Sequence, residues 1–285
     1  MAVTSTRSTR RNNFTVISRQ HQLTDQAGWR PPLLGPNTAM KILEPTYEER
    51  YVRKQATRAR HAPPITIPKL VYTPGRKQQI IKVGIFARLH GDEEAGTHAA
   101  FDLIRWAWND PEEIHDFSLH VYPICNPSGR NLGTRHSIND RDLNREFWTG
   151  SQEPEVVYLE NELKRERYHI IISLHADEDS DGVYGFVSGD VLSAQVLKPA
   201  LAAAEKHLPI NREPLIDGFL AKDGIVTEGY QGVLSAPPDQ HPRPIEIVFE
   251  TPNRASMEKQ VAANVDAVKA ILAQYRLLLA HAPNL

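Results

Sequence analysis

Residues 78–108 read QQIIKVGIFARLHGDEEAGTHAAFDLIRWAW, a mainly apolar run followed by a stretch with helical periodicity. The near-continuous apolar character of the first part predicts a strand covered on both faces, as in a mostly parallel sheet. A helix directly after such a strand is typical of α/β proteins. We therefore expect a strand, a charged turn and a helix, in that order, within this stretch.

The same alternation continues along the chain. The apolar runs FSLHVYPI, YHIIISLH, VYGFVS and PIEIVFE predict further strands, and helical patterns cover residues 93–108, 153–167, 190–207 and 257–281. This order favours a three-layer α/β/α fold around a mixed, mostly parallel sheet. A Pro-rich link, HAPPITIPKL, precedes it, so we expect an N-terminal extension at 1–70 and one main domain at 71–285.

Composition narrows the class of protein. The formal charge of -2, from 33 basic and 35 acidic residues, gives no reason to expect a nucleic acid or a membrane as partner. No stretch reaches the roughly 18 apolar residues of a membrane span, and no secretory signal is visible, so we expect a cytoplasmic protein. The arginine-rich first 24 residues are expected to be partly disordered, and Met40 is an alternative start. The single cysteine, Cys125, rules out a disulfide within the chain and is expected to be buried.

Two of the predicted strands end in residues that bind metals. If a helix begins at Gly91, the i,i+3 spacing puts His90 and Glu93 on one side of its first turn. The run YHIIISLHAD ends near His175, which completes a His, Glu, His set and leaves zinc a fourth position for water. Such a set commonly selects zinc in hydrolases, although the sequence does not exclude another divalent ion. Less suitable third ligands are His98, His136, His169 and His241.

A third strand, PIEIVFETP, ends at Glu250. A carboxylate beside a water on zinc can take its proton while the metal polarises the scissile carbonyl. Glu246 has the same side-chain direction by period-two spacing, so spacing leaves both open. The position at the carboxyl end of the strand favours Glu250, because ligands bind at that edge of an open α/β sheet.

Two loops have unusual charge. Residues 126–148, NPSGRNLGTRHSINDRDLNREFW, are dense in arginine, which suits capture of a carboxylate or stabilisation of an oxyanion, or a solvated basic loop. The acidic run DEDSDG at 177–182 could favour a cationic group or bind calcium, but a solvated loop is the simpler interpretation.

Five motifs occur in a familiar order: HGDE, NPSG, TRHSINDRDLNREF, SLHAD and FETP. From about Ile80 to the C-terminus the chain resembles the zinc carboxypeptidase family, the carboxypeptidase A/B-like metallopeptidases. The resemblance implies one zinc ion on His90, Glu93 and His175, with Glu250 as general base. The resemblance also implies that Arg135 holds the carbonyl oxygen of the substrate, and that Asn144 and Arg145 bind its terminal carboxylate. It further implies that Asp142 accepts a hydrogen bond from His90 and that Tyr230 is the mobile tyrosine that closes over substrate.

HGDE and DLNR also resemble the related succinylglutamate desuccinylase and aspartoacylase branch, whose members hydrolyse N-acyl amino acids. Residues 71–285 are therefore expected to form a zinc-hydrolase domain that cleaves an amide bond next to a free carboxylate, as a metallocarboxypeptidase does on a small peptide. The alternative is an N-acyl amino-acid deacylase. A non-catalytic binding protein on the same fold is a third reading.

Overall fold

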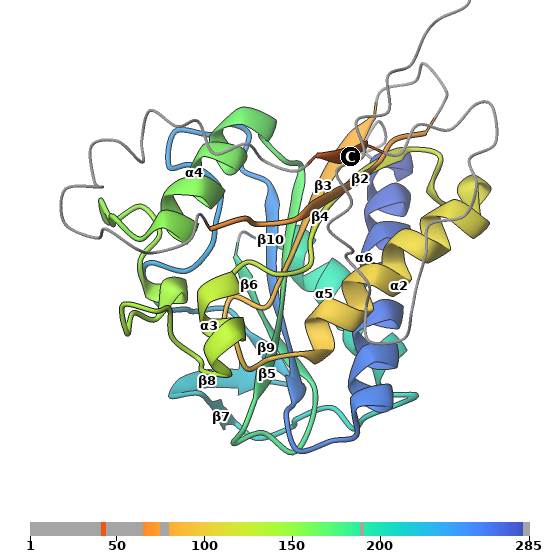
Figure 1. Cartoon of the computed structure of the whole chain (residues 1–285). Coiled ribbons are helices and arrows are strands. Elements are labelled where there is room, and N and C mark those ends of the chain that lie inside the picture. The colour runs from red at the N-terminus through yellow and green to blue at the C-terminus, as the bar shows by residue number, and fades with distance from the viewer. Residues whose placement is uncertain (1–40, 44–64, 75–79, 189–190, 282–285) are drawn as a thin grey trace, which may run out of the picture. The chain divides into compact units, whose positions relative to one another are not determined.

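The computed structural model describes residues 41–43, 65–74, 80–188 and 191–281. They form a mixed sheet with helices on both faces (Figure 1), which confirms the predicted α/β fold. The boundary at residue 70 stays a prediction, and strand β2, Lys69–Tyr72, lies across it. Met40 and the N-terminal arginines lie outside the described residues.

The sheet has ten strands, and its centre is parallel. Strands β4, β3, β5 and β10 run parallel, whereas β2 pairs with β4, and β6 with β10, in antiparallel fashion. The predicted mixed sheet is thus confirmed: three of its parallel pairs lie at the centre, a fourth joins β6 and β9, and the other five strand pairs in the described residues are antiparallel. In spatial order the strands are β1 (Lys41–Leu43), β2 (Lys69–Tyr72), β4 (Phe117–Tyr122), β3 (Ile81–Ala87), β5 (Ile170–Asp177), β10 (Ile245–Pro252), β6 (Tyr184–Ser188), β9 (Ile225–Val226), β8 (Phe219–Lys222) and β7 (Leu215–Ile216).

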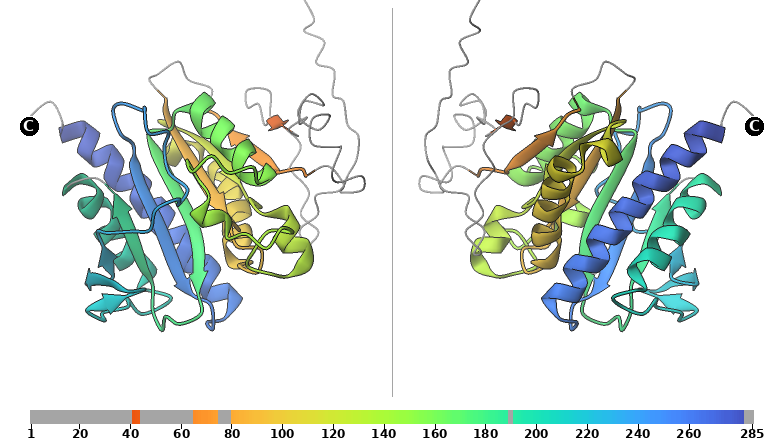
Figure 2. Two further views of the ribbon diagram at one scale, coloured as in Figure 1. Left: turned by 90° about the vertical axis from the view of Figure 1, so that its left-hand side faces the viewer. Right: turned by 90° about the vertical axis from the view of Figure 1, so that its right-hand side faces the viewer.

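Helices cover the two faces unequally (Figure 2). Helices α2, α5 and α6 pack on one face, and α4 packs on the other. The α-helices are α2 (Ala95–Asn109), α3 (Pro127–Leu132), α4 (Pro154–Glu166), α5 (Val191–Ala204) and α6 (Met257–His281). The four long helices expected from periodicity are confirmed, and no helix in the described part of the chain is long and apolar enough to cross a membrane.

The central strands bury side chains on both faces. In β5, Ile170 and Ile172 join the core beneath α2, α5 and α6, whereas Ile171 joins the core beneath α4. The alternation follows from the pleat of the strand. On the α4 side, Phe86 stacks on Tyr122 with ring centroids 4.7 Å apart. The continuous apolar runs of the sequence therefore reflect strands buried on both sides, as predicted.

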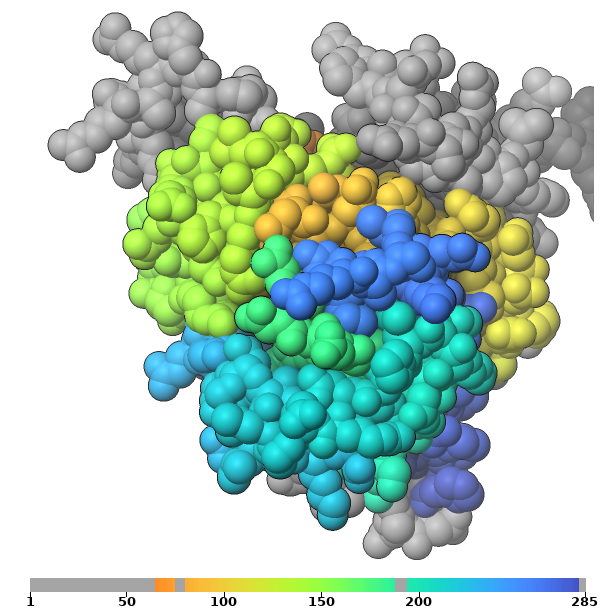
Figure 3. All heavy atoms as spheres, turned by 90° about the horizontal axis from the view of Figure 1, so that it is seen from below, coloured from red at the N-terminus to blue at the C-terminus, as the bar shows by residue number. Residues whose placement is uncertain are grey.

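The order of the central strands positions the site. Strands β3, β5 and β10 are neighbours and parallel, so their carboxyl ends meet at one edge of the sheet. Glu250 in β10 pairs directly with His175 in β5. Figure 3 views this edge, where the yellow, green and blue parts of the chain adjoin one another.

Candidate active site

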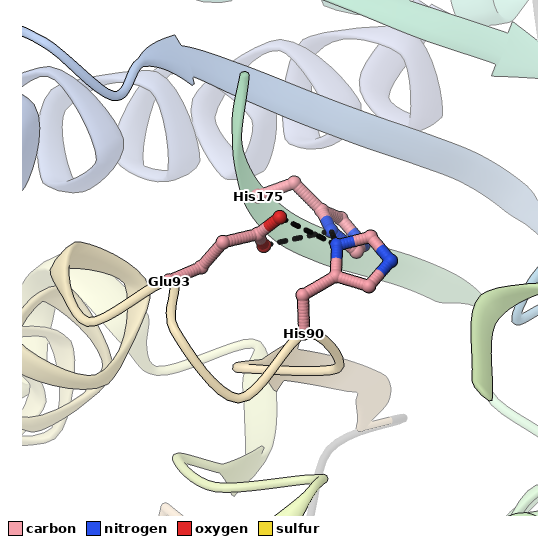
Figure 4. A group of neighbouring side chains, drawn as sticks. All are labelled: His90, Glu93 and His175. Atoms are coloured by element: carbon pink, nitrogen blue, oxygen red, sulfur yellow. Dashed lines mark hydrogen bonds and ion pairs between the residues drawn. The ribbon is translucent and has the colours of Figure 1, made fainter. Parts of the chain in front are cut away.

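Three buried side chains from two of these strand ends converge (Figure 4). His90, Glu93 and His175 are each at most 4% exposed, and each offers one ligand atom within 4.8 Å of the others. The Nδ1 atom of His90 lies 2.5 Å from Glu93 Oε1, and His175 Nδ1 lies 3.0 Å from Glu93 Oε2. The two Nδ1 atoms are 3.2 Å apart. This group could hold one metal ion, because ligand bonds of about 2 Å need donor atoms at about this spacing.

The local backbone differs from the expectation. Helix α2 covers Ala95–Asn109, in agreement with the helical pattern expected at 93–108, so the condition of a helix that begins at Gly91 is not met. A turn precedes it instead, in which Glu93 N donates to His90 O at 3.2 Å. The turn is held by a close crossing, since a Cβ atom on Gly91 would lie 2.1 Å from the backbone of Gly129. The turn still brings His90 and Glu93 together.

The pKa values of His90, Glu93 and His175 depend on one another. Burial raises the pKa of Glu93, but the charges of His90 and His175 outweigh it and lower the pKa to about 2. Burial opposes protonation of His90, yet Glu93 and the Asp142 hydrogen bond raise its pKa to about 9. For His175 burial dominates and lowers the pKa. A cation that binds here must displace the proton held between these groups, as is usual for histidine ligands.

Asp142 links the far side of His90 to Arg135. His90 Nε2 lies 3.2 Å from Asp142 Oδ1, and Arg135 Nη2 donates to Asp142 Oδ2 at 3.2 Å. Burial raises the pKa of the Asp142 carboxyl, but the His90 hydrogen bond and nearby positive charges lower it overall. A second nitrogen of Arg135, Nη1, lies 3.8 Å from Glu93. The guanidinium is thus held beside the His, Glu, His group.

The structure separates the two glutamates that spacing leaves open. Glu246 accepts hydrogen bonds from Ala236 N at 2.6 Å and from Arg243 at 3.0 Å, so it is fully engaged away from the site. Glu250 lines the cavity beside His90 and Glu93. Burial raises the pKa of Glu250 well above its usual range, and the charge of Glu93 adds to the rise. Both effects favour the protonated form of the Glu250 carboxyl group over the charged form.

Asn144, Arg145 and Tyr230 also line the cavity. Arg145 Nη1 donates to the Asn144 carbonyl at 2.8 Å, and its guanidinium stacks on the Tyr230 ring at 3.9 Å from the centroid. The Tyr230 hydroxyl donates to the Asp217 backbone carbonyl at 2.9 Å. The structure therefore brings together all nine residues singled out in the sequence.

The cavity has a volume of about 450 Å³ and carries opposite charges. Two arginines line it, together with seven acidic side chains: Asp92, Glu93, Asp177, Glu178, Asp179, Asp217 and Glu250. Three members of the acidic run after His175 line this cavity, and two of them, Glu178 and Asp179, are exposed to solvent. Tyr184, whose hydroxyl donates to Asp177 at 2.9 Å, lines it as well.

Sequence reasoning missed Asp217 and Tyr184. Asp217 lies in the turn of the β7–β8 hairpin, where Asp217 and Gly218 both have positive φ, 51° and 81°. An Asp-Gly pair between short apolar stretches is a signal for such a turn. The sequence could have revealed the hairpin, but not that its turn borders the cavity.

The remaining histidines lie elsewhere. His98 contacts Glu94 at 3.5 Å, His136 lies 2.8 Å from Asp140, and His169 accepts from Lys82 N at 3.0 Å. His241 is exposed. Among the described residues, His90, Glu93 and His175 are the one group found with metal-binding spacing. Cys125 is fully buried, as expected, and burial raises the pKa of its thiol.

Comparison with known proteins gives matches in sequence. Residues 79–211 match the model of the succinylglutamate desuccinylase/aspartoacylase catalytic domain. Carboxypeptidase SOL1 of Arabidopsis thaliana is 25% identical over 91 residues, which form 30% of this chain and 18% of that protein. The match therefore spans less than a fifth of that curated relative.

Solved structures share the fold. A candidate metallopeptidase from Shewanella amazonensis has a TM-score of 0.65 at 18% identity, over 82% of this chain and 86% of that one. A metallo-carboxypeptidase from Burkholderia cenocepacia has a TM-score of 0.60 at 19% identity, over 85% and 66%. Another, from Pseudomonas aeruginosa in complex with (2-guanidinoethylmercapto)succinic acid, has a TM-score of 0.60 at 16% identity, over 81% and 70%.

The family model points to a hydrolase of the deacylase type over residues 79–211, and the solved structures show that the fold is shared with metallo-carboxypeptidases. In sequence motifs and in fold, the chain thus resembles the metallo-carboxypeptidases and the related succinylglutamate desuccinylase/aspartoacylase branch, as its sequence predicted.

Proposed function

We propose that this protein is a zinc-dependent hydrolase that cleaves an amide bond next to a free carboxylate, with His90, Glu93 and His175 as the zinc ligands. One observation carries the proposal: these three donors converge, buried, beside a cavity that His90, Glu93, Glu250 and Arg135 line. Two imidazole nitrogens and one carboxylate form a donor set that suits zinc and leaves room for a fourth ligand.

Bound zinc would polarise the substrate carbonyl and lower the pKa of an adjacent water molecule. Glu250 takes the proton from that water and returns it to the leaving amine. Burial and the charge of Glu93 raise the pKa of Glu250, which makes its carboxylate a stronger base. Asp142 keeps the His90 ring oriented through Nε2, so that Nδ1 faces the zinc position.

Two arginines contact different groups of the substrate in this proposal. Arg135, held by Asp142, stabilises the negative charge that develops on the carbonyl oxygen. Arg145 and Asn144 bind the free carboxylate, which fixes the scissile bond relative to Glu250. Stacking on Tyr230 covers one face of the Arg145 guanidinium and leaves the edge, with its N–H donors, for a carboxylate.

A second candidate activity is removal of an N-acyl group from an amino acid. The match of residues 79–211 to the desuccinylase/aspartoacylase model favours it. The charge of the cavity disfavours acidic N-acyl substrates, because five carboxyl side chains besides Glu93 and Glu250 line it, against two arginines, and would repel a second carboxylate. We therefore expect peptides and neutral or basic N-acyl amino acids to be cleaved before N-acyl aspartate or glutamate.

The full-length protein, loaded with one equivalent of zinc, tests the proposal. It should cleave a carboxyl-terminal peptide bond or an N-acyl amino acid, and a chelator should abolish turnover. Glu250→Gln should bind zinc normally and lose about 10²–10⁴ in kcat, the usual share of a general base. Glu246→Gln is the matched control, because Glu246 is engaged with Arg243 and should leave turnover close to that of the wild type.

Three results would contradict the proposal in different ways. Full turnover in Glu250→Gln would exclude this general base. Turnover that survives chelation would exclude zinc. Stoichiometric zinc without turnover on any amide would indicate a binding protein on a hydrolase fold.

A further inference from the structure

We propose that Asn126 is a positioning residue that fastens the loop of Arg135 to the loop of His90, and so sets the distance between the oxyanion arginine and the zinc ligands. The inference rests on the proposed function of the site. It concerns a residue outside the cavity wall, at the amino end of α3, where three segments of chain cross.

The Asn126 amide group bridges two loops. Its Nδ2 donates to the Leu89 carbonyl at 3.2 Å and to the Arg135 carbonyl at 3.3 Å. Its Oδ1 accepts from Gly129 N at 2.7 Å, which caps α3. Two carbonyls on one side and an N–H on the other fix which way the amide points. Asn126 is fully buried, so neither donor bond is replaced by water if it is lost.

The crossing is too tight for the loops to move independently. A Cβ atom on Gly91 would lie 2.1 Å from the Gly129 backbone, and one on Gly129 would lie 2.4 Å from the His136 carbonyl. Gly91 N also donates to the Arg135 carbonyl at 3.2 Å. The Arg135 carbonyl thus receives two donors, from the His90 loop and from Asn126, next to the residue whose guanidinium must meet the substrate.

The outer side of the Arg135 loop is held in the same way. Ser128 Oγ lies 2.6 Å from Glu155 Oε1 and accepts from Ile138 N at 3.1 Å. Ser137 Oγ donates to Glu153 Oε2 at 2.8 Å. Helix α4, which carries Glu155, therefore supports the loop from outside, while Asn126 ties it to the zinc-ligand turn from inside.

Asn126→Asp separates the two roles of the residue. The aspartate keeps the oxygen that caps α3 but replaces the donor with an oxygen that faces two carbonyls. Asn126→Ser is the second variant, because serine also caps helices but is too short to bridge the loops. Asn264→Asp is the matched control: Asn264 is equally buried, donates to Gln260 O at 3.0 Å, and lies in α6, away from the cavity.

The first measurement needs no substrate. In the zinc-loaded, full-length protein, amide hydrogen exchange in residues 88–94 and 135–138 should become at least about tenfold faster in both Asn126 variants. These segments should be unchanged in Asn264→Asp. Unchanged exchange at Gly91, whose N–H donates directly to the Arg135 carbonyl, would overturn the inference.

The second measurement uses whichever amide the wild type cleaves. Asn126→Asp should lower kcat by about 10–100-fold with little change in KM, as expected when a catalytic group is displaced by about 1 Å. Because Asn126 acts through Arg135, adding Asn126→Asp to Arg135→Gln should cost little more than Arg135→Gln alone. If the two substitutions instead lower kcat independently, so that the loss in the double variant is the product of the two single losses, Asn126 has a merely structural role. If the wild type cleaves no amide, the proposed function fails, and the exchange data still decide whether Asn126 ties the loops.

Discussion

Asp142→Asn should weaken zinc binding and turnover together, because one carboxylate serves both His90 and Arg135. Its Oδ1 lies 3.2 Å from His90 Nε2 and accepts from Asn144 N at 2.9 Å, while Oδ2 accepts from Arg135 at 3.2 Å. The amide keeps the shape of the carboxylate but loses its charge, and its NH₂ group cannot accept from Arg135 or from a ring N–H.

The expected magnitude follows from these contacts. Loss of the partner that orients a histidine ligand costs about 10–100-fold in metal affinity, which is about 1.4–2.8 kcal/mol at about 1.4 kcal/mol per tenfold change. Turnover at saturating zinc should fall further, because Arg135 loses the acceptor that holds its guanidinium beside Glu93.

Zinc affinity is measured by competition with a chromogenic chelator, and kcat is then measured at saturating zinc. The control is Asp140→Asn: Asp140 is exposed, contacts His136 and has a φ of 58°, which asparagine tolerates. It should change zinc affinity by less than about twofold. An Asp142→Asn protein that binds zinc within about threefold of the wild type, with kcat intact, would refute the assigned role.

Two further predictions concern the buried charges beneath α4. Lys69→Met should lower the free energy of unfolding, measured in urea, by about 3–5 kcal/mol, because Glu162 and Glu166 lose a partner at 3.0 and 2.8 Å. The control is Lys82→Met, at a half-exposed position, which should lower it by about 1 kcal/mol or less. Equal losses in the two variants would contradict a special role for the buried Lys69 charge. Acidification should also destabilise the fold, because Lys69 lowers the pKa of Glu166 to about 2 from 4.5 despite its partial burial. The unfolded chain therefore takes up this proton first as pH falls from about 5 towards 2, at a cost of about 1–2 kcal/mol after solvent screening, and Glu166→Gln should flatten that part of the pH profile of stability.

The central strands and long helices could be predicted because their signal is local. Runs such as IIISL have the length and composition of a strand buried on both faces, and the 3.6-residue period of 257–281 matches α6 in full. Parallel neighbours share an edge at their carboxyl ends, so the meeting of His90, His175 and Glu250 followed from the predicted architecture.

Strand β2 shows where local pattern fails. Its sequence, KLVY, is short, and Lys69 is of a type that is seldom buried. In the structure Lys69 is 1% exposed, because Glu162 and Glu166, more than 90 residues away, neutralise it. No local pattern contains that pairing. The shape of the turn at Gly91 could not be predicted for a similar reason, since it depends on contact with Gly129, a segment that the spacing of His90 and Glu93 does not include.

The division between predicted and unpredicted residues has a physical basis. Two of the proposed zinc ligands and Glu250 lie at or just beyond the ends of central strands, where packing on both sheet faces fixes the backbone. Asp217, which was not predicted, lies in the turn of the edge hairpin β7–β8, where its side chain accepts from the Tyr230 hydroxyl at 3.1 Å. Loops on a rigid scaffold can change without disturbing the fold. The groups proposed for hydrolysis are therefore readable from sequence, whereas a cavity-lining group on an edge hairpin, such as Asp217, must be found in the folded structure.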